Sequence, residues 1–374
     1  MKYENDERIV ITLDAGGTNF VFSAIQGNKQ IVDEICLDAN ADNLEKSLLN
    51  IVEGFSLVKE KLGTNPAAIS FAFPGPADYP NGIIGDAGNF PGYRGGVALG
   101  PMLTEKFGLP VFINNDGDLF AYGEAIAGFL PYINNKLKDA GNSKRYTNVF
   151  GITLGTGFGS GIVRNGEIYL GDNSIAGEIC LVRNKISPSE SVEEYASIRG
   201  IQRVYASYAG IKKQESPTPK EIYEIATGQI AGNKDAAIEA YKQMGEVVGD
   251  AISNAITLLD GLVVLGGGLA GASSLFLPFL VGEMRSTFTR FDGSRHKRLI
   301  AEIYNLDDDI DAEMFVRTEA KEINVFGTDK KVTYDPSQKI GIGVSKLGTS
   351  RAISIGAYAF ALHKIDSKRF INCL

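Results

Sequence analysis

The sequence predicts an α/β protein built from two similar halves. Short apolar runs typical of buried strands recur at 8–13, 149–154 and 261–265, and they alternate with segments of helical periodicity. The string ITLDAGGTN at 11–19 matches ITLGTGFGS at 152–160 in strand, turn and following strand. We therefore interpret the chain as a duplicated domain in which each copy opens with a strand, a glycine turn and a second strand.

In the first half, strands are expected at 8–13, 20–25 and 30–37, with glycine turns between them that are typical of hairpins. Apolar residues at helical spacing predict a helix over 43–61 that ends at Gly63. A buried strand at 67–73 is closed by Pro74-Gly75-Pro76. A further strand at 110–113 leads through Asn115-Asp116 into a small, apolar segment at 119–128, which predicts a helix.

The second half repeats this order. A strand at 149–154 runs into the glycine-rich turn 155–161, and a long helix at 237–259 precedes the strand 261–265 and the triple glycine 266–268. Two polar stretches do not fit the repeat, and we expect 131–147 and 287–338 to be solvated surface insertions.

Composition excludes several function classes. The net charge of −8 and the pI near 5.1, without any basic block, argue against a nucleic-acid surface. Three cysteines lie far apart and form no metal-spaced cluster, which predicts a reducing cytoplasm. Only two histidines are present, which disfavours histidine-rich metal sites and a Ser-His-Asp hydrolase. The start of the chain lacks the apolar core of a signal peptide, and no apolar run reaches bilayer-spanning length. A soluble cytoplasmic protein with no membrane partner is expected.

Asp116 is the most informative residue. A carboxylate held where a strand passes into a helix can accept a proton from a substrate hydroxyl, and such junctions line the ligand crevice of α/β sheets. Asp is equally a favoured helix N-cap, so this segment alone leaves cap and general base evenly balanced.

The two glycine turns offer backbone N–H groups that can bind phosphates. Asp14, at the end of the first strand, is suited to holding Mg²⁺ through water. Neither turn matches a P-loop, because no Gly-Lys-Ser/Thr follows, and neither matches the dinucleotide fingerprint, because a strand and not a helix comes next.

Several segments, in order along the chain, resemble motifs of the ROK family of sugar kinases within the actin-like ATPase superfamily. ITLDAGGTN resembles the first phosphate motif, and Phe73-Pro74-Gly75-Pro76 with Asn89-Phe90-Pro91-Gly92 resembles the sugar-side loops. The segment 113–124 resembles the catalytic motif, 154–161 the second phosphate motif and 264–269 the adenosine motif. This resemblance implies two ribonuclease H-like lobes around a central cleft.

The resemblance also implies roles for individual residues. Asp116 would be the general base, and Asp14 would lie near Mg²⁺. The sugar would be bound by Gly75, Asn89, Asn115, Asp116, Glu178 and Glu193. ATP would be bound by Asp14, Gly16, Gly17, Thr18, Asn19, Gly155, Thr156, Gly157, Gly267 and Gly268.

The chain departs from the family pattern in one region. ROK proteins carry Gly-Glu-x-Gly-His followed by a cysteine cluster for structural zinc, whereas this chain has Gly177-Glu178-Ile179-Cys180-Leu181 and no cysteine in 182–191. We therefore expect no structural zinc. The run 191–197 resembles the end of the family motif and makes Glu193 the second sugar-binding acid, although acids here also suit an ordinary helix start.

These observations predict an ATP- and Mg²⁺-dependent kinase for a hydroxyl of a hexose or N-acetylhexosamine, similar to glucokinase. The alternative is a sugar-binding regulatory protein or pseudokinase of the same family without a DNA-binding domain. We expect an N-terminal lobe over 1–115, to which a closing helix within 345–374 returns, and a C-terminal lobe over 116–344. The family resemblance also allows a homodimer.

Overall fold

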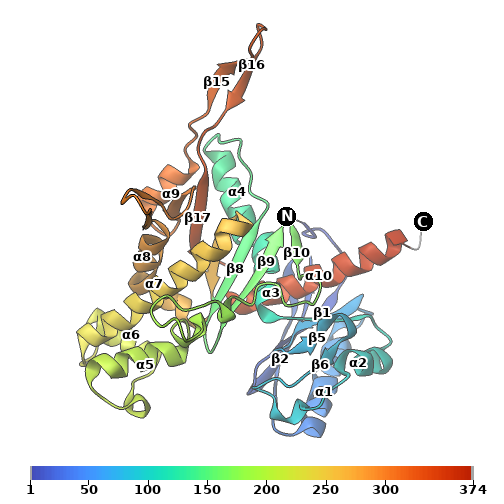
Figure 1. Cartoon of the computed structure of the whole chain (residues 1–374). Coiled ribbons are helices and arrows are strands. Elements are labelled where there is room, and N and C mark those ends of the chain that lie inside the picture. The colour runs from blue at the N-terminus through green and yellow to red at the C-terminus, as the bar shows by residue number, and fades with distance from the viewer. Residues whose placement is uncertain (1, 372–374) are drawn as a thin grey trace. The chain divides into compact units, whose positions relative to one another are not determined.

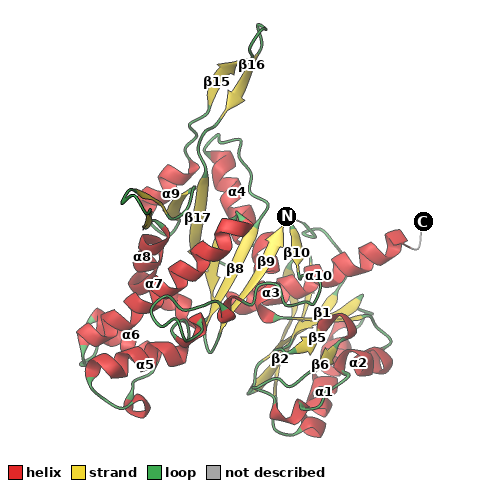
Figure 2. Cartoon of the chain, viewed as in Figure 1, coloured by secondary structure: helices red, strands yellow, loops and turns green. Residues whose placement is uncertain are grey.

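The computed structural model describes residues 2–371 and has the predicted α/β class. It divides into two compact units (Figure 1). Unit 1 contains residues 1–131, 160–177 and 346–374, and unit 2 contains residues 132–159 and 178–345. In both units helices flank the strands, as Figure 2 shows by colour. The last three residues of the predicted closing segment, with Cys373 among them, lie outside the described residues.

Unit 1 is built on a five-stranded sheet with strand order β3-β2-β1-β4-β7. The strands are β1 (Val10–Ala15), β2 (Asn19–Gln26), β3 (Lys29–Asp38), β4 (Ala68–Ala72) and β7 (Val111–Asn114). The first three form an antiparallel meander, and β4 and β7 run parallel to β1. Because side chains alternate along a strand, Ile11 and Leu13 face one core while Val10 faces another.

Helices cover both faces of this sheet. On one side lies α1 (Leu44–Leu62), which begins at the Asn43 side-chain cap and ends at Gly63 in the left-handed conformation. On the other side lies α10 (Thr349–Ile371), which packs against β1 and β4 and against α3 (Asp116–Ile126). The smaller elements of this unit are β5 (Ala77–Asp78), β6 (Ile83–Ile84) and α2 (Leu99–Phe107).

The second sheet has the order β10-β9-β8-β11-β17-β14. Its strands are β8 (Val149–Leu154), β9 (Phe158–Arg164), β10 (Glu167–Tyr169), β11 (Leu262–Gly266), β14 (Glu302–Asn305) and β17 (Lys339–Val344). The four strands β8, β11, β17 and β14 belong to unit 2 and are parallel to one another. The near-continuous burial of β8, β11 and β17 agrees with a parallel sheet covered on both faces.

The helices of unit 2 include a pair that packs closely through glycine. A Cβ at Gly245 or Gly249 of α7 (Lys234–Leu259) would lie 2.5 or 2.6 Å from a backbone oxygen of α8 (Ser273–Met284). Such a distance requires glycine, so the two helix backbones approach to near contact. Two further helices, α5 (Ile198–Ala209) and α6 (Pro219–Thr227), pack against α7.

The expectation that 131–147 and 287–338 are solvated surface insertions was wrong in part. Within 131–147 the chain forms most of α4 (Phe129–Asp139), whose Ile133 and Leu137 are buried. Within 287–338, β14 joins the main sheet, and α9 (Asp309–Val316) buries Phe315 against the ring of Tyr146. The many charged residues of both stretches indicated a solvated surface, so the few apolar side chains that are buried there were not predicted.

Two hairpins in 287–338 do match the expectation of an exposed surface. They are β12 (Thr287–Thr289) with β13 (Arg295–Lys297), and β15 (Lys321–Asn324) with β16 (Lys331–Tyr334). The second hairpin extends beyond α9 and β17 in Figure 1.

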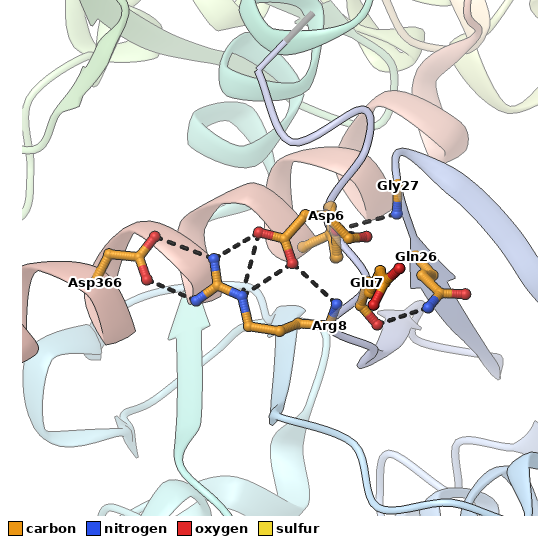
Figure 3. A network of polar contacts seen from close by, with 7 residues as sticks. Asp6, Glu7, Arg8, Gln26, Gly27 and Asp366 are labelled. Atoms are coloured by element: carbon orange, nitrogen blue, oxygen red, sulfur yellow. Dashed lines mark hydrogen bonds and ion pairs between the residues drawn. The ribbon is translucent and has the colours of Figure 1, made fainter.

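An ion-pair network joins the two ends of the chain within unit 1 (Figure 3). The Arg8 guanidinium donates to Asp6 at 2.6 Å and to Asp366 of α10 at 2.6 Å. The Tyr358 hydroxyl of α10 accepts a hydrogen bond from Gly27 N at 3.0 Å. These contacts attach the start of the chain and the β2–β3 turn to the closing helix.

None of the described helices combines the length and the apolar character needed to cross a membrane.

Candidate functional site

The junction between β7 and α3 places Asp116 at the first residue of the helix and Asn115 at its N-cap. The Asn115 side-chain oxygen accepts a hydrogen bond from Gly117 N at 2.8 Å, which satisfies an N–H that the helix leaves open. The cap is therefore Asn115. The Asp116 carboxylate also accepts a hydrogen bond from Gly117 N, at 2.8 Å.

A buried asparagine lies directly below this junction. Asn114 is 1 % exposed, and its side-chain oxygen accepts from Asn115 N at 2.8 Å. A Cβ on Gly117 would lie 2.6 Å from the backbone oxygen of Ser160, so the first turn of α3 is packed against β9 without room for a side chain. The hydrogen bond at Asn115 N and the close packing at Gly117 thus fix the backbone before and after Asp116.

Asp14 lies at the end of β1 on the same side of the unit 1 sheet as α10. Burial raises the pKa of its carboxyl group, a hydrogen bond with Ser350 lowers it, and the negative charge of Asp116 raises it again. Asp14 and Ser350 line a pocket of about 540 Å³ together with Glu34. The pKa of the Asp14 carboxyl group is therefore above its usual value, chiefly because the group is buried.

The first phosphate turn is a tight hairpin. Gly16 N donates to Asn19 O at 3.0 Å, which leaves Gly17 and Thr18 at the tip. A Cβ on Gly17 would lie 3.5 Å from the backbone oxygen of Asn89, so the turn and the Asn89 loop are neighbours.

An aromatic cluster holds the three predicted loops of unit 1 in place. Phe20 follows the phosphate turn, Phe73 precedes the Gly75 loop, and Phe90 follows Asn89. Phe90 stacks on Phe20 with 6.1 Å between ring centroids and lies 4.7 Å from the Phe73 ring. All three rings are fully buried, so the packing that positions these loops is independent of any ligand.

In unit 2, the second phosphate turn is attached to the segment that carries Glu193. Phe158 N donates to a Glu193 oxygen at 3.0 Å, and Ile198 N donates to Gly155 O at 2.8 Å. A Cβ on Gly157 would lie 2.9 Å from the same Glu193 oxygen. The other oxygen of Glu193 accepts from the Arg199 guanidinium at 2.6 Å. Both carboxylate oxygens of Glu193 are therefore engaged within this unit.

Glu178 lies beside Cys180 at the short 3₁₀ helix η3 (Ile179–Leu181). The Cys180 thiol donates to a Glu178 oxygen at 3.4 Å. Burial raises the pKa of this thiol to about 12, and the charges of Glu178 and Glu193 add to the effect. Cys180 is thus a neutral donor that lies near both predicted sugar-binding acids. Leu181 is 75 % exposed and gives this region an apolar side chain.

The segment in which the resemblance places the zinc cysteines is closed by hydrogen bonds around Asn184. This side chain is fully buried, and its oxygen accepts from Ile186 N at 2.9 Å and from Ser187 N at 3.2 Å. Backbone bonds from Asn184 N to Glu190 O and from Val192 N to Val182 O complete the loop. Across residues 2–371, no three His, Cys, Asp or Glu side chains are grouped so that they could hold a metal ion.

The predicted adenosine motif lies beside the second phosphate turn in unit 2. Gly267 has φ of +87°, and a Cβ there would lie 2.2 Å from the backbone oxygen of Leu154. Gly268, the next residue, has no atom within 4 Å of its Cβ position. Glycine therefore permits a close backbone contact at Gly267 and leaves open space at Gly268.

The predicted site residues are divided between the two units. Unit 1 holds Asp14, Gly16, Gly17, Thr18, Asn19, Gly75, Asn89, Asn115 and Asp116, and unit 2 holds Gly155, Thr156, Gly157, Glu178, Glu193, Gly267 and Gly268. Which ligand each of these residues binds is still a prediction.

Sequence reasoning missed three residues that support the site. Asn114 could have been recognised as a polar residue at the end of an apolar strand, and Arg199 as a cation six residues after Glu193. Ser350 gives no such signal, because it lies more than 300 residues from Asp14.

Several known proteins are similar to this chain in sequence or in fold. The model of the ROK family matches residues 10–308. The crystal structure of a glucokinase from Parabacteroides distasonis superposes with a TM-score of 0.88 at 55% sequence identity and covers 97% of this chain and 99% of that chain.

Two more distant relatives extend the comparison. An N-acetyl-D-glucosamine kinase of Vibrio cholerae is 28% identical over 70% of this chain and 85% of its own length. A ROK family glucokinase of Streptomyces griseus, solved with glucose and AMPPNP, has a TM-score of 0.60 at 18% identity, covers 94% of this chain and 98% of its own, and supports the fold alone. The match to the family model over most of the chain, together with the extensive relationship to the Parabacteroides structure, shows that this chain belongs to the ROK family.

Proposed function

We propose that this protein is an ATP-dependent sugar kinase that phosphorylates a hydroxyl of a hexose or an N-acetylhexosamine. One observation carries the proposal: Asn115 occupies the N-cap of α3, and the Asp116 carboxylate follows it at the first residue of the helix, directly after the buried strand β7. The names of the relatives, glucokinase and N-acetyl-D-glucosamine kinase, support the substrate class.

In the proposed reaction, Asp116 acts as the general base. Its carboxylate accepts the proton of the sugar hydroxyl as the hydroxyl oxygen attacks the γ-phosphorus of ATP. A new bond forms between the sugar oxygen and phosphorus, the bond from phosphorus to the β–γ bridging oxygen breaks, and ADP leaves with that oxygen.

The two glycine turns supply the contacts to the triphosphate. Gly17 and Thr18 in unit 1, and Thr156 and Gly157 in unit 2, are proposed to offer backbone N–H groups to phosphates. The N–H groups of Gly16 and Gly155 donate within the turns, to Asn19 O and Gly157 O, so these two glycines are proposed to allow the phosphates to approach the backbone closely. Gly267 and Gly268 are proposed to flank the nucleoside. Asp14 is proposed to hold Mg²⁺ through water, and the cation would neutralise charge on the phosphates.

The sugar is proposed to contact Asn115 through its side-chain N–H₂, because its oxygen serves the helix cap. Glu178 and Glu193 are the proposed sugar-binding acids, and Gly75 and Asn89 are further proposed sugar contacts. Leu181 stands where the family has histidine, and its exposed side chain offers a sugar apolar contact instead of a hydrogen bond. This feature suits an acetamido methyl group as well as an unsubstituted hexose.

The test is the Asp116→Asn variant, which keeps the shape of the side chain but cannot take a proton. With Mg-ATP and a panel of hexoses and N-acetylhexosamines, we expect the wild type to phosphorylate at least one sugar and the variant to lose about 10³-fold in kcat. Calorimetric titration with the same sugar and with ATP should show affinities within a few-fold of wild type. A variant that retained most of its kcat would exclude Asp116 as the base.

One alternative has a specific observation in its favour. Leu181 and the cysteine-free 182–191 loop suit a sugar-binding regulatory protein or pseudokinase. Transfer of ³²P from γ-labelled ATP to any sugar of the panel would exclude this alternative, and sugar binding without transfer would establish it.

A further inference from the structure

We propose that unit 2 carries a second binding site, for a small organic acid with one carboxylate on an apolar body, at the edge of its sheet where the parallel strands begin. A pocket of about 490 Å³ lies at this edge. Its lining includes Asp260 shortly before β11, Ala301 directly before β14 and Lys339 at the start of β17. Pockets of roughly 300–1,000 Å³ that combine apolar walls with a few polar groups are typical of small-molecule sites.

The pocket is separate from the predicted nucleotide contacts of this unit. Because β8 and β11 run parallel, their first residues share one edge of the sheet, and the glycine turns that follow them share the opposite edge. A strand of six residues such as β8 spans roughly 20 Å. All the described residues that line the pocket belong to unit 2. A ligand in the pocket is therefore distinct from the proposed sugar and ATP.

Part of the lining is apolar. Ile256, Leu299 and Ile340 are buried, whereas Ile300, which follows Leu299, is 87 % exposed. The exposed isoleucine extends the apolar surface of the buried ones into solvent. A ligand with an apolar body would remove this surface from water, which is favourable.

Arg298 supplies a guanidinium group that is held in place. Its Nη2 donates to Asp250 Oδ1 at 2.9 Å and to Asn254 Oδ1 at 2.8 Å, both on α7. The guanidinium also lies over the Phe288 ring, 4.6 Å from the ring centroid. Its Nε–H is buried and has no hydrogen-bond partner among the described residues. A carboxylate is a suitable acceptor for this unused donor, because arginine binds carboxylates through adjacent N–H groups.

Lys339 is a second basic residue of the lining, and it is only 7 % exposed. Its Nζ donates to the backbone oxygens of Met314 at 2.8 Å and Arg317 at 2.7 Å, at the end of α9. These acceptors carry no formal charge, so they fix the ammonium group without neutralising it. A fixed positive charge in a partly desolvated position attracts an anion more strongly than a charge in bulk water does.

The balance of charge favours a ligand with a single negative charge. Of the described residues that line the pocket, Lys144, Arg298 and Lys339 are basic and Asp260 is acidic. Asp250 forms an ion pair with Arg298, so three positive charges stand against two negative ones and one net positive charge remains. Asp260 and the C-terminal end of α7, which bears a partial negative charge, would repel a second charge on the ligand.

The first experiment titrates the full chain with 3-phenylpropionate, which joins one carboxylate to an apolar ring, and follows the probe by NMR. We expect saturable binding with a dissociation constant of about 1 mM or below, as for a ligand of this size. The neutral 3-phenylpropionamide, and acetate without the apolar body, should each bind about fivefold more weakly or less. Phenyl phosphate, which approaches two negative charges at pH 7, should also bind more weakly than the carboxylate.

The second experiment compares variants of exposed residues. Lys144→Met and Ile300→Ser, within the lining, should each raise the dissociation constant of 3-phenylpropionate about threefold or more. Lys138→Met and Ile310→Ser make the same changes at exposed positions that do not line the pocket, and they should leave the constant within about 1.5-fold. Arg298→Lys keeps the charge but loses the adjacent N–H groups, and it should weaken binding about fivefold. Thermal melting checks the fold of each variant.

Three results would overturn the proposal: no saturable binding of 3-phenylpropionate to the wild type, equal affinities for this probe and its amide, or equal effects of the lining variants and their controls. Tighter binding of phenyl phosphate than of 3-phenylpropionate would overturn the assignment to a ligand with one negative charge. Because binding and not turnover is measured, the outcome does not depend on the proposed kinase activity.

Discussion

At the scale of single residues, the Glu193 carboxylate combines a proposed role in sugar binding with an observed contact to a glycine turn. It is a proposed sugar-binding acid, and in the structure it accepts a hydrogen bond from Phe158 N of the second phosphate turn. Arg199 holds the other oxygen, and the same guanidinium nitrogen also lies 2.8 Å from Glu194. We therefore propose that Arg199 is a positioning residue: it holds the Glu193 carboxylate, which in turn accepts a hydrogen bond from the predicted phosphate turn.

We predict that Arg199→Ala raises the KM for ATP about tenfold with a smaller fall in kcat, because Glu193 then loses its fixed orientation. Arg199→Lys should recover part of the loss, since lysine keeps the charge but not the planar geometry. Steady-state kinetics with ATP and sugar varied separately provide the measurement.

Arg203→Ala is the matched control for this prediction. Arg203 lies one turn further along α5 and also forms an ion pair, with Glu190 at 2.9 Å. Its removal should change the KM for ATP by less than about twofold. If both variants shifted this KM equally, Arg199 would contribute only to the stability of α5.

At the scale of elements, the contact between α3 and α10 determines where Asp116 is held in unit 1. The two helices approach so closely that a Cβ at Gly123 would lie 1.9 Å from Ala352 O, and a Cβ at Gly356 would lie 1.9 Å from Leu119 O. Neither distance is possible for a real side chain, so the crossing depends on glycine at both places.

We expect Gly356→Ala to reduce the free energy of unfolding by about 3 kcal/mol, because the added methyl group must push two helix backbones apart. Gly282→Ala in α8 is the control, since no atom lies within 4 Å of its Cβ position, and it should be neutral or slightly stabilising. Urea unfolding followed by circular dichroism measures both. Equal stability of the two variants would contradict the close approach of α3 and α10.

At the scale of the whole chain, the segment before β1 and the closing helix stabilise unit 1 together. Arg8 bridges Asp6 and Asp366, two carboxylates more than 350 residues apart in sequence (Figure 3). The hydrogen bonds from Arg8 hold the pKa of Asp6 below its usual value. The side chains are partly exposed, so solvent screens the interaction.

We predict that Arg8→Met lowers the free energy of unfolding by about 1 kcal/mol at pH 7. The sign of its pH dependence follows from the lowered pKa of Asp6. The stabilisation is fully present above the pKa of aspartate in the unfolded chain and is lost as the pH falls through the lower folded value. Thermal melting of wild type and variant between pH 7 and pH 3 should show the difference shrinking toward acid pH. A difference that stayed constant or grew over this range would contradict the assignment.

Much of the fold followed from local patterns. The hairpin around 14–19, the helix that ends at Gly63 and the strand before the triple glycine were predicted from apolar periodicity and glycine turns, and the structure confirms them as β1–β2, α1 and β11. These features depend on residues that are neighbours in sequence, so a single chain reveals them. The prediction for 131–147 was wrong because a few apolar residues spaced along a charged helix outweigh its overall polarity once they are packed.

The sequence by itself determined the α/β class, the duplicated glycine turns and the candidate residues of the site. Tertiary structure decided how those residues are used: Asn115 and not Asp116 provides the helix cap, Glu193 is bound to the second phosphate turn, and a buried aromatic cluster holds three loops of unit 1. It also showed which part of 287–338 joins the core and which part forms exposed hairpins. Hydrogen bonds and packing contacts between residues far apart in sequence set these outcomes, and no local pattern in one sequence reports them.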